Sequence, residues 1–353
     1  MGCGSQEHPH AARRTRPSAF CEKAKPLKRE TDILFIAAFQ APFVQEDIDI
    51  LSKHFRVKTL IGHGFGQVLK IALGVLRADV VYCWFGSVYA SVAVMIAGWI
   101  GIKSVIAIGG VDISKDERLN YGIWTSGWKS KFVRYAFRHA SRLLVSDLSM
   151  KAAAMRLAEY SGANIVYVPP ALDSEFWKPL GVKEEHILTV ASAANHQRMR
   201  LKGFDILTEA ARRLPQFTFH VVGVDPTVTF ELQPPANMTF YPARPRKELL
   251  PFYQSAKIYC QPSVHEALCY TLREAMLCEC IPVASEVGGM TTAVSGIGVL
   301  VPPENVDALV GGLLRAMRMT HEAGEKGRAR MVALYAKEKR EAELPRLVEG
   351  LGS

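Results

Sequence analysis

The sequence predicts an α/β protein in which two doubly wound parallel-sheet domains face each other across a cleft. Two observations predict this class. Apolar runs of strand length alternate with helical patterns along nearly the whole chain, which is typical of parallel sheets covered by helices on both faces. A length of 353 residues, 49% of them hydrophobic, is sufficient for two cores. Such domains bind ligands at the carboxyl ends of their strands.

Six strands are expected in the first domain, which spans residues 31–178. They are Asp32–Ala37, Arg56–Ile61, Val80–Trp84, Ser104–Ile108, Leu143–Ser146 and Ile165–Val168. Helical patterns lie between them, as in Gln45–His54 and Lys129–His139. Residues 1–30, which precede this domain, have no apolar signal segment and are predicted to form a disordered basic tail.

One apolar run in the first domain, from Val88 to Gly110, is long enough to cross a bilayer. However, Gly98, Gly101 and Lys103 interrupt it. A buried helix followed by a buried strand explains the run better, because it continues the rhythm of the flanking strands.

The second domain is predicted to span residues 179–353. The proline-rich break Val168–Gly181 marks the junction. Its strands are expected at Ile187–Ala191, Phe217–Val222, Ile258–Cys260, Ile281–Ala284 and Val299–Val301, and its helices at Phe204–Leu214, Glu248–Ser255 and Val306–Met319. The charged helical segment at the end of the chain is expected to close this domain. Alternatively, its helices pack back on the first domain.

Charge and cysteine content restrict the partners and the compartment. The formal net charge is +9, and the basic excess lies mostly in the first half, together with all five tryptophans. Contact with an anionic partner, such as a membrane surface or a phosphorylated acceptor, is one interpretation of this excess. The other is that half of it belongs to residues 1–30, which carry a net charge of +4. No nucleic-acid partner is expected. The seven cysteines form no CxxC pair, which favours a reduced cytoplasmic location, with association at the inner membrane face as an option.

The stretch "HEALCYTLREA" places Glu266 and Glu274 on either side of a predicted loop-to-helix junction. One interpretation is a capping box, with Thr271 as N-cap and Glu274 three residues later. The other is an anion site, because free N–H groups at a helix start favour a phosphate. The two carboxylates would then bracket that phosphate and bind vicinal diols.

The surrounding segment resembles the donor site of retaining GT-B glycosyltransferases, closest to glycosyltransferase family 4. The resemblance is carried by "PSVHEALCYTLREAMLCECIPVASEVGG" and, upstream, by "VASAANHQRMRLKGFDILTEAARRLPQFTFHVVG". In the first half, "IAIGGVDISKDERLNYG", "ASRLLVSDLSMKAAA" and "VYVPPALDSEFWKP" resemble the acceptor domain and the hinge. The resemblance implies GT-B architecture, that is, two facing Rossmann-like domains.

It also implies roles at the donor site. Glu274 would hold the ribose hydroxyls, and Glu266 would contact the transferred sugar. Lys202, which precedes Gly203, would neutralise the departing pyrophosphate together with Arg198 or Arg200, between which the sequence does not decide. The backbone of four consecutive residues would cradle the distal phosphate: Leu268, Cys269, Tyr270 and Thr271. The family usually has a glycine where Cys269 stands.

On the acceptor side, the segment that resembles the family offers Gly109, Gly110 and Asp112, of which Asp112 is the catalytic candidate. Trp84 and Gly86 follow a predicted strand and are expected to line the cleft. Asp47 and Asp49 match the sequence pattern of a metal-binding DxD motif. However, they lie in a helical pattern, in which residues two apart point to different sides, and they are expected to lie on a solvated helix face.

The resemblance implies transfer of a hexosyl group from a nucleoside diphosphate sugar to an acceptor hydroxyl with retention of configuration. The departing phosphate would assist on the front face, without a cofactor or an essential metal. A glycan, a lipid-linked molecule or a small molecule would serve as acceptor. The alternatives are a non-hydrolysing sugar-nucleotide epimerase on the same fold and a non-catalytic nucleotide-sugar-binding protein. The nucleotide base and the oligomeric state stay open.

Overall fold

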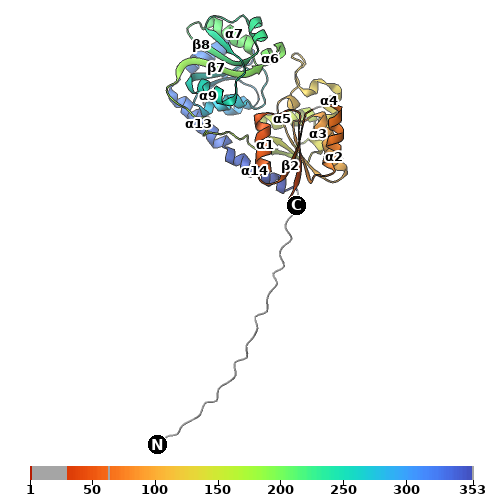
Figure 1. Cartoon of the computed structure of the whole chain (residues 1–353). Helices are drawn as coiled ribbons and strands as arrows, with labels where there is room; N and C mark the ends of the chain where they lie inside the picture. The colour runs from red at the N-terminus through yellow and green to blue at the C-terminus, as the bar shows by residue number, and fades with distance from the viewer. Residues whose placement is uncertain (2–29, 63, 352–353) are drawn as a thin grey trace. The chain divides into compact units, whose positions relative to one another are not determined.

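The computed structural model describes Met1, residues 30–62 and residues 64–351, and it contains two six-stranded sheets (Figure 1). The first sheet has the order β2-β1-β3-β4-β5-β6, and the second has the order β12-β11-β10-β7-β8-β9. The pairings within both sheets are parallel, for example between β1 and β3 and between β10 and β11. Both sheets belong to one compact unit that starts at Thr31. The predicted tail falls almost wholly outside the described residues.

The first lobe consists of β1 to β6 and the helices between them. Its elements are β1 (Asp32–Ala37), α1 (Pro42–Ser52), β2 (Arg56–Ile61), α2 (Phe65–Val75), β3 (Val80–Trp84), α3 (Val88–Trp99), β4 (Lys103–Ala107), the 3₁₀ turns Val111–Ile113 and Ile123–Thr125, α4 (Gly127–His139), β5 (Arg142–Val145), α5 (Leu148–Ala158) and β6 (Ile165–Tyr167). The helix and strand predicted for the long apolar run are α3 and β4. Over the described part of the chain, no helix combines the length and the apolar character needed to cross a membrane.

The second lobe consists of β7 to β12 with helices α6 to α13. Its elements are β7 (Glu184–Ala193), α6 (His196–Leu201), α7 (Phe204–Arg213), β8 (Thr218–Val224), α8 (Pro226–Leu232), β9 (Met238–Tyr241), α9 (Arg246–Ser255), β10 (Ala256–Gln261), α10 (Tyr270–Leu277), β11 (Ile281–Ser285), α11 (Gly288–Val294), β12 (Val299–Val301), α12 (Val306–Met317) and α13 (His321–Tyr335). The sequence prediction missed β9, the edge strand beside β8.

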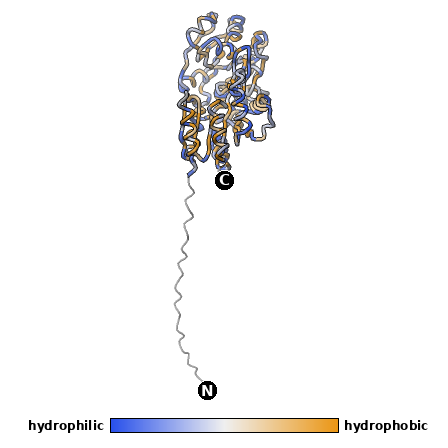
Figure 2. Tube along the Cα trace, turned by 90° about the vertical axis from the view of Figure 1, so that its right-hand side faces the viewer, coloured by the Kyte–Doolittle hydropathy of each residue, from blue (hydrophilic) through white to orange (hydrophobic). Residues whose placement is uncertain are grey.

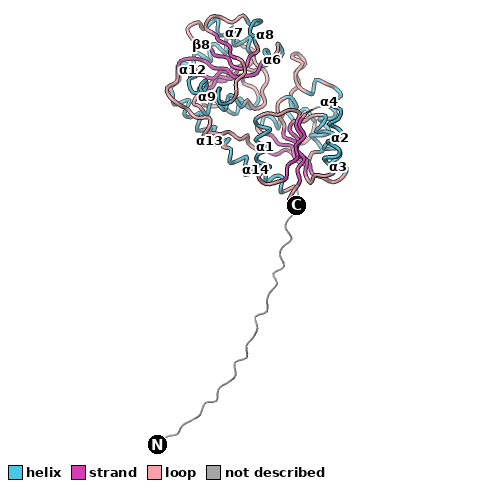
Figure 3. The backbone as a smooth tube through the Cα atoms, viewed as in Figure 1, coloured by secondary structure: helices cyan, strands magenta, loops and turns pink. Residues whose placement is uncertain are grey.

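Each sheet is covered on both faces, as Figure 3 shows for strands between helices. In the first lobe, one apolar cluster lies between the sheet and helices α2 to α5. Another includes Ile33 and Phe35 of the sheet, Val44 of α1, and Leu344 and Val348 of the last helix, α14 (Lys337–Glu349). Figure 2 shows that hydrophobic and hydrophilic residues alternate along the chain. The alternation arises because each element buries one side against a sheet.

The chain returns from the second lobe to the first at its end. Helix α13 packs on α10 of the second lobe, whereas α14 packs on α1 of the first. The two sheets change over between Tyr167 and Glu184. The domain limits 31–178 and 179–353 stay a prediction, and α14 contributes to the core of the first lobe although it belongs to the second half of the sequence.

The prediction that Asp47 and Asp49 form a solvated face is wrong for Asp47. Asp49 is exposed, but Asp47 is fully buried and accepts hydrogen bonds from Tyr82 Oη and Trp84 Nε1, both at 2.7 Å. The guanidinium of Arg340 on α14 pairs with it at 2.6 and 2.7 Å. Local helical spacing could not reveal this burial, because the partner comes from the other end of the chain.

Candidate active site

A cleft of about 670 Å³ lies between the two lobes at the carboxyl ends of their strands. This is where facing parallel sheets bind ligands. From the first lobe, the lining comes from segments that follow β1, β3, β4 and β5: Phe39, Phe43, Trp84, Phe85, Ile108, Gly109, Gly110, Val111, Tyr121, Ser146 and Met150. From the second lobe, it comes from the end of β7, from α6 and from the segment before α10: Val190, Ala191, Ser192, Ala194, Asn195, Arg198, Lys202, Glu266, Ala267, Leu268, Cys269, Tyr270 and Thr271.

Lys202 and Glu266 form an ion pair inside this cleft. Their side chains are only 16% and 13% exposed. Burial alone would lower the pKa of Lys202, but the Glu266 carboxylate outweighs that effect and holds the pKa above its usual value. Lys202 is therefore an ammonium across the neutral pH range, and it places a fixed positive charge in the cleft beside Glu266.

Side chains behind the cleft hold the Glu266 loop in place. Ser263 Oγ donates to Glu266 Oε1 at 3.3 Å, and Gln261 Nε2 donates to Ser263 Oγ at 2.7 Å. Tyr259 Oη lies 2.8 Å from both Gln261 Oε1 and Thr271 Oγ1. Because this network joins the end of β10 to the start of α10, it fixes the loop between them from both ends.

Two glycines allow the backbone to pass close to this loop. Gly203 has φ +69°, and a Cβ there would lie 2.0 Å from the carbonyl oxygen of Pro262. Gly288 has φ +50°, and a Cβ there would lie 1.8 Å from the carbonyl oxygen of Glu266. Only glycine fits such a position. The Lys-Gly and Gly-Gly elements of the sequence therefore bring α7 and α11 against the segment that carries Glu266.

The predicted capping box is wrong. Helix α10 begins at Tyr270, and its N-cap is Cys269, which makes no side-chain capping bond. Thr271 Oγ1 instead bonds Tyr259, so it does not cap the helix. Cys269 has φ 59°, a left-handed conformation that glycine adopts more easily. The left-handed backbone at position 269 thus suits the glycine that the family usually has there.

Glu274 lies on α10 behind the cleft rather than among its lining residues. It accepts hydrogen bonds from Tyr253 Oη at 3.3 Å and from Arg246 at 3.4 Å. Burial raises the pKa of Glu274 to about 7, although Arg246 and Tyr253 act in the opposite direction. In this structure, therefore, Glu274 and Glu266 do not face one ligand together.

The two arginine candidates differ in position. Arg198 lines the cleft, and its guanidinium carbon lies 5.9 Å from the ring centre of Tyr121. Arg200 is exposed and is not among the lining residues. Arg198 is therefore the better candidate for contact with a diphosphate. The nearby Asn195 caps α6 by accepting from Arg198 N at 2.9 Å, so it fixes the backbone at that point.

On the first-lobe side, the predicted residues divide into lining and supporting groups. Trp84, Gly109 and Gly110 line the cleft, but Gly86 and Asp112 do not. The Asp112 carboxylate is buried and accepts from Gly86 N at 2.7 Å and from Gly109 N at 2.9 Å. Burial raises its pKa to about 6, and the backbone N–H groups oppose this. Asp112 therefore ties two loops together, and its position does not support the expected catalytic role.

Sequence reasoning missed the residues that join the lobes across the cleft. His265 Nε2 lies 2.6 Å from Asp116 Oδ2, and Gln197 Nε2 donates to the carbonyl oxygens of Leu119 and Asn120 at 2.7 and 2.8 Å. These contacts hold the segment after β4, which carries Tyr121, against the second lobe. No local pattern marked them, because each pair is formed by residues far apart in the sequence.

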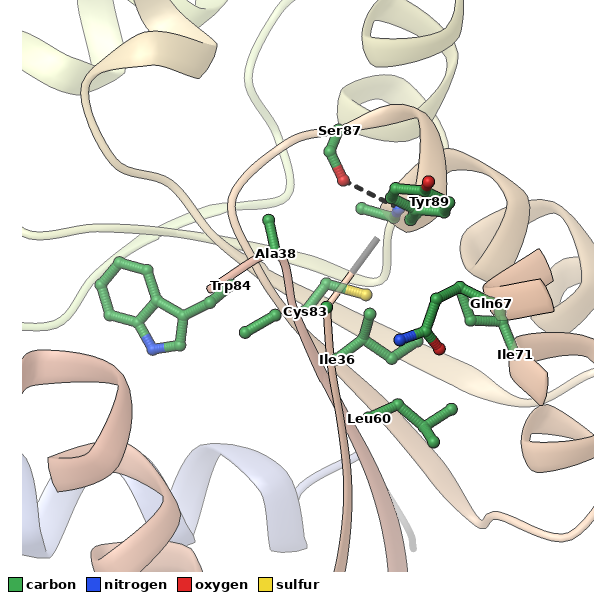
Figure 4. Close-up of a pocket in the computed structure, with 12 residues that line it drawn as sticks. Ile36, Ala38, Leu60, Gln67, Ile71, Cys83, Trp84, Ser87 and Tyr89 are labelled. Atoms are coloured by element: carbon green, nitrogen blue, oxygen red, sulfur yellow. Dashed lines mark hydrogen bonds between the residues drawn. The ribbon is translucent and has the colours of Figure 1, made fainter. Parts of the chain in front are cut away.

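A smaller cavity in the first lobe is not a second substrate site. Its volume is about 10 Å³, on the order of one water. Figure 4 shows Ile36, Leu60, Ile71 and Gln67 around it, with Trp84 directed away from Gln67 and Ile71. The Trp84 indole instead reaches Asp47 through its Nε1. The cavity is a packing gap beside β1 and β3.

Two facing Rossmann-like lobes, with a cationic cleft at the carboxyl ends of both sheets, define an α/β protein of the GT-B class. Solved structures support this fold. A sucrose-phosphate synthase from Thermosynechococcus elongatus has a TM-score of 0.75 at 15% identity, over 91% of this chain and 99% of that one. The Anabaena protein HepE in complex with UDP-glucose has a TM-score of 0.74 at 16% identity, over 91% and 100%. The predicted GT-B fold class is confirmed.

The second lobe adds a family match. Residues 176–333 match the family model described as Glycosyl transferases group 1. A D-inositol 3-phosphate glycosyltransferase from Mycobacteroides abscessus is 28% identical over 188 residues, which cover 48% of this chain and 42% of that protein. The match thus spans less than half of that relative's length. Residues 176–333 are thus similar to group 1 glycosyltransferases, which agrees with the predicted transferase.

Proposed function

We propose that the protein is a retaining glycosyltransferase of the family 4 type. It transfers a hexosyl group from a nucleoside diphosphate sugar to an acceptor hydroxyl. The observation that carries this proposal is the buried pair of Lys202 and Glu266 beside Arg198 in the cleft between the two sheets. A nucleoside diphosphate leaving group needs fixed cations, and a sugar needs a carboxylate that accepts from its hydroxyls.

The donor would lie along the second-lobe side of the cleft. Its distal phosphate would bind at the backbone from Leu268 to Thr271, where α10 begins and its N-cap residue, Cys269, makes no side-chain capping bond. Lys202 and Arg198 would neutralise the diphosphate as it departs. Glu266 would accept from hydroxyls of the transferred sugar. For Glu274 to bind the ribose hydroxyls, its carboxylate would have to leave Arg246 and Tyr253, its partners in this structure.

The transfer forms a bond from the acceptor oxygen to the anomeric carbon and breaks the bond from that carbon to the phosphate oxygen. The acceptor proton passes to the departing phosphate on the same face, so the configuration is retained. Lys202 and Arg198 stabilise the charge that develops on the phosphate. We propose that no cofactor and no essential metal take part. Among the described residues, no group of three or more His, Cys, Asp or Glu side chains could hold a metal ion.

The two alternative functions are less well supported. The matched domain and the named relative are glycosyltransferases, which favours transfer over epimerisation. The Lys202 and Glu266 pair inside the cleft favours an active site over a passive binding surface.

A thermal-shift panel of nucleoside diphosphate sugars tests the proposal. A donor present at 100 times its Kd should add about 2.7 kcal/mol to the free energy of unfolding. With the donor identified, the anomeric configuration of the product, read by NMR, tests retention, and assays with and without EDTA test the metal-free mechanism. Isomerisation of the donor without an acceptor would indicate the epimerase, and failure of every donor to stabilise the protein would refute the donor site.

The exposed surface of the first lobe supports a second, separable proposal, contact with an anionic membrane from the cytoplasmic side. Leu69 and Leu73 of α2 are exposed, as is Leu76, its C-cap, and α4 exposes Trp128 beside Lys129. Exposed apolar and basic side chains on one surface suit the interface of an anionic bilayer. Sedimentation with phosphatidylglycerol vesicles, compared with phosphatidylcholine vesicles, measures this contact. Equal recovery with both vesicle types would contradict it.

A further inference from the structure

The first-lobe side of the cleft is a wall of aromatic rings. We call Phe39, Phe43, Trp84 and Phe85 the aromatic wall; all four line the cleft. The rings of Phe39 and Phe85 stack with centres 4.9 Å apart, and those of Phe43 and Trp84 are 5.0 Å apart. Phe39 is 51% exposed. Phe39 therefore presents apolar surface that no part of the described chain covers fully, whereas Trp84 is buried and Phe43 stacks on Tyr270 of α10.

The backbone is strained where it places one of these rings. Phe85 has φ 72°, in a region that a bulky side chain seldom adopts. Gly109 leaves room for the ring, since a Cβ there would lie 2.4 Å from Phe85 Cε1. Strain of this kind persists where the surrounding structure fixes it, and it gathers at ligand sites. Phe85 is thus held in the cleft in an unfavourable backbone conformation.

The same side of the cleft offers few free polar groups. The Trp84 indole N–H is used by Asp47, and the Gly109 N–H is used by Asp112. Among the first-lobe residues that line the cleft, in the described part of the chain, Tyr121 and Ser146 carry the only polar side chains besides Trp84, and none is charged. The cations of the cleft, Lys202 and Arg198, lie on the second-lobe side, where the donor diphosphate needs them.

This distribution restricts the acceptor. At the aromatic wall itself a phosphorylated acceptor would have no counter-charge, since Arg156 of α5 lines an adjoining pocket that shares Met150 and Glu266 with the cleft but does not line the wall. A free sugar would leave several hydroxyls without partners at the wall, and both situations are costly in a cleft. An apolar body would instead cover the exposed ring of Phe39 and gain from its burial. We propose that the acceptor presents its hydroxyl on an uncharged molecule with an apolar hydrocarbon or aromatic body, which packs on the aromatic wall. This inference rests on the proposed glycosyl transfer.

The acceptor so defined differs from the one that a relative's name indicates. The relative from Mycobacteroides abscessus is a D-inositol 3-phosphate glycosyltransferase, and its name indicates a phosphorylated acceptor. The matched stretch covers 42% of that protein, so a different acceptor here is compatible with the similarity.

Binding measurements that need no donor test the inference directly. Octyl β-glucoside below its micelle concentration, 4-nitrophenyl β-glucoside, glucose and inositol 3-phosphate are titrated into the full chain by calorimetry. We expect one or both of the apolar glucosides to bind, and glucose and inositol 3-phosphate to bind at least about tenfold more weakly. The octyl and nitrophenyl compounds distinguish a hydrocarbon from an aromatic body.

Two variants show whether binding occurs at the aromatic wall. Phe39→Ala should weaken binding of the preferred glucoside about tenfold, since it removes an exposed ring. Trp99→Ala is the matched control, because Trp99 is 74% exposed at the end of α3 and does not line the cleft. Circular dichroism confirms that both variants fold.

The outcomes separate the inference from the proposed function. Tighter binding of glucose or inositol 3-phosphate, absence of glucoside binding, or equal loss in both variants would overturn the acceptor assignment while leaving the donor site intact. Stabilisation by no nucleoside diphosphate sugar in the thermal-shift panel would instead refute glycosyl transfer, whatever the glucosides do.

Discussion

The substitution Asp47→Ala should destabilise the protein strongly, although Asp47 lies outside the cleft. Its carboxylate accepts four hydrogen bonds, from Tyr82, Trp84 and twice from Arg340, at 2.6 to 2.7 Å. Without it, the Arg340 guanidinium, which is 3% exposed, keeps its charge in the interior. Removing one partner of a buried ion pair costs about 3–5 kcal/mol, chiefly because the other charge is left without compensation.

A matched control lies on the same two helices. Lys53, the C-cap of α1, pairs with Glu341 of α14 at 3.1 Å, but these side chains are 59% and 39% exposed. Lys53→Ala should therefore cost less than about 1 kcal/mol. A double variant, Asp47→Leu with Arg340→Met, removes both charges and should recover much of the loss, since apolar replacement of a buried pair is often close to neutral.

Urea denaturation followed by tryptophan fluorescence and by circular dichroism measures these changes as shifts of the midpoint. The expected order of stability is wild type, close to Lys53→Ala, then the double variant, then Asp47→Ala. If Asp47→Ala unfolded at the same urea concentration as Lys53→Ala, the buried pair would contribute no more to stability than the exposed pair. That result would refute the reasoning from burial.

Three further predictions concern the site. Lys202→Ala should lower kcat about 10²–10³-fold, because it removes a group that stabilises transition-state charge. Arg200→Ala is the control and should leave kcat nearly unchanged. Steady-state kinetics with the identified donor measure kcat for both variants. Because burial raises the pKa of Glu274 to about 7 from an unfolded value near 4.5, its contribution to stability is complete below pH 4.5 and is lost as pH rises through 7. Urea midpoints from pH 5 to 8 should therefore fall less for Glu274→Gln than for wild type; an equal fall would contradict the assigned burial. Gly203→Ala should abolish donor stabilisation in the thermal-shift assay, because its Cβ would lie 2.0 Å from the Pro262 carbonyl oxygen; normal donor binding would show that the loop can move.

The regular part of the fold could be predicted from the sequence. Buried parallel strands read as continuous apolar runs, so β1 (Asp32–Ala37) and β3 (Val80–Trp84) have the predicted limits. The edge strand β9 (Met238–Tyr241) was missed because it is short and not continuously apolar. Hydrogen bonding to β8 stabilises β9 as a strand, although its own sequence pattern does not predict one.

Local motifs in the sequence single out candidate site residues, whereas contacts between residues far apart in the sequence leave no local pattern. Lys202 and Glu266 were recognised as candidates from the motifs that contain them, and the structure joins them in one ion pair. The burial of Asp47 is not predicted, because its partner Arg340 comes from the far end of the chain, and the catalytic role expected of Asp112 stays a prediction. Cys269 stands where the family usually has glycine. Its backbone nevertheless has the left-handed conformation that glycine adopts easily.

The return of α14 to the first lobe affects the order in which the protein can fold during synthesis. Ile33 and Phe35 are made early, yet they share a core with Leu344 and Val348, which are made some 300 residues later. At about 5–20 residues per second, the first lobe must wait on the order of tens of seconds for its last helix. During that interval α1 presents an uncovered apolar surface and an unpaired Asp47 carboxylate. A nascent chain stopped before α14 should therefore be a better substrate for chaperones than the finished protein.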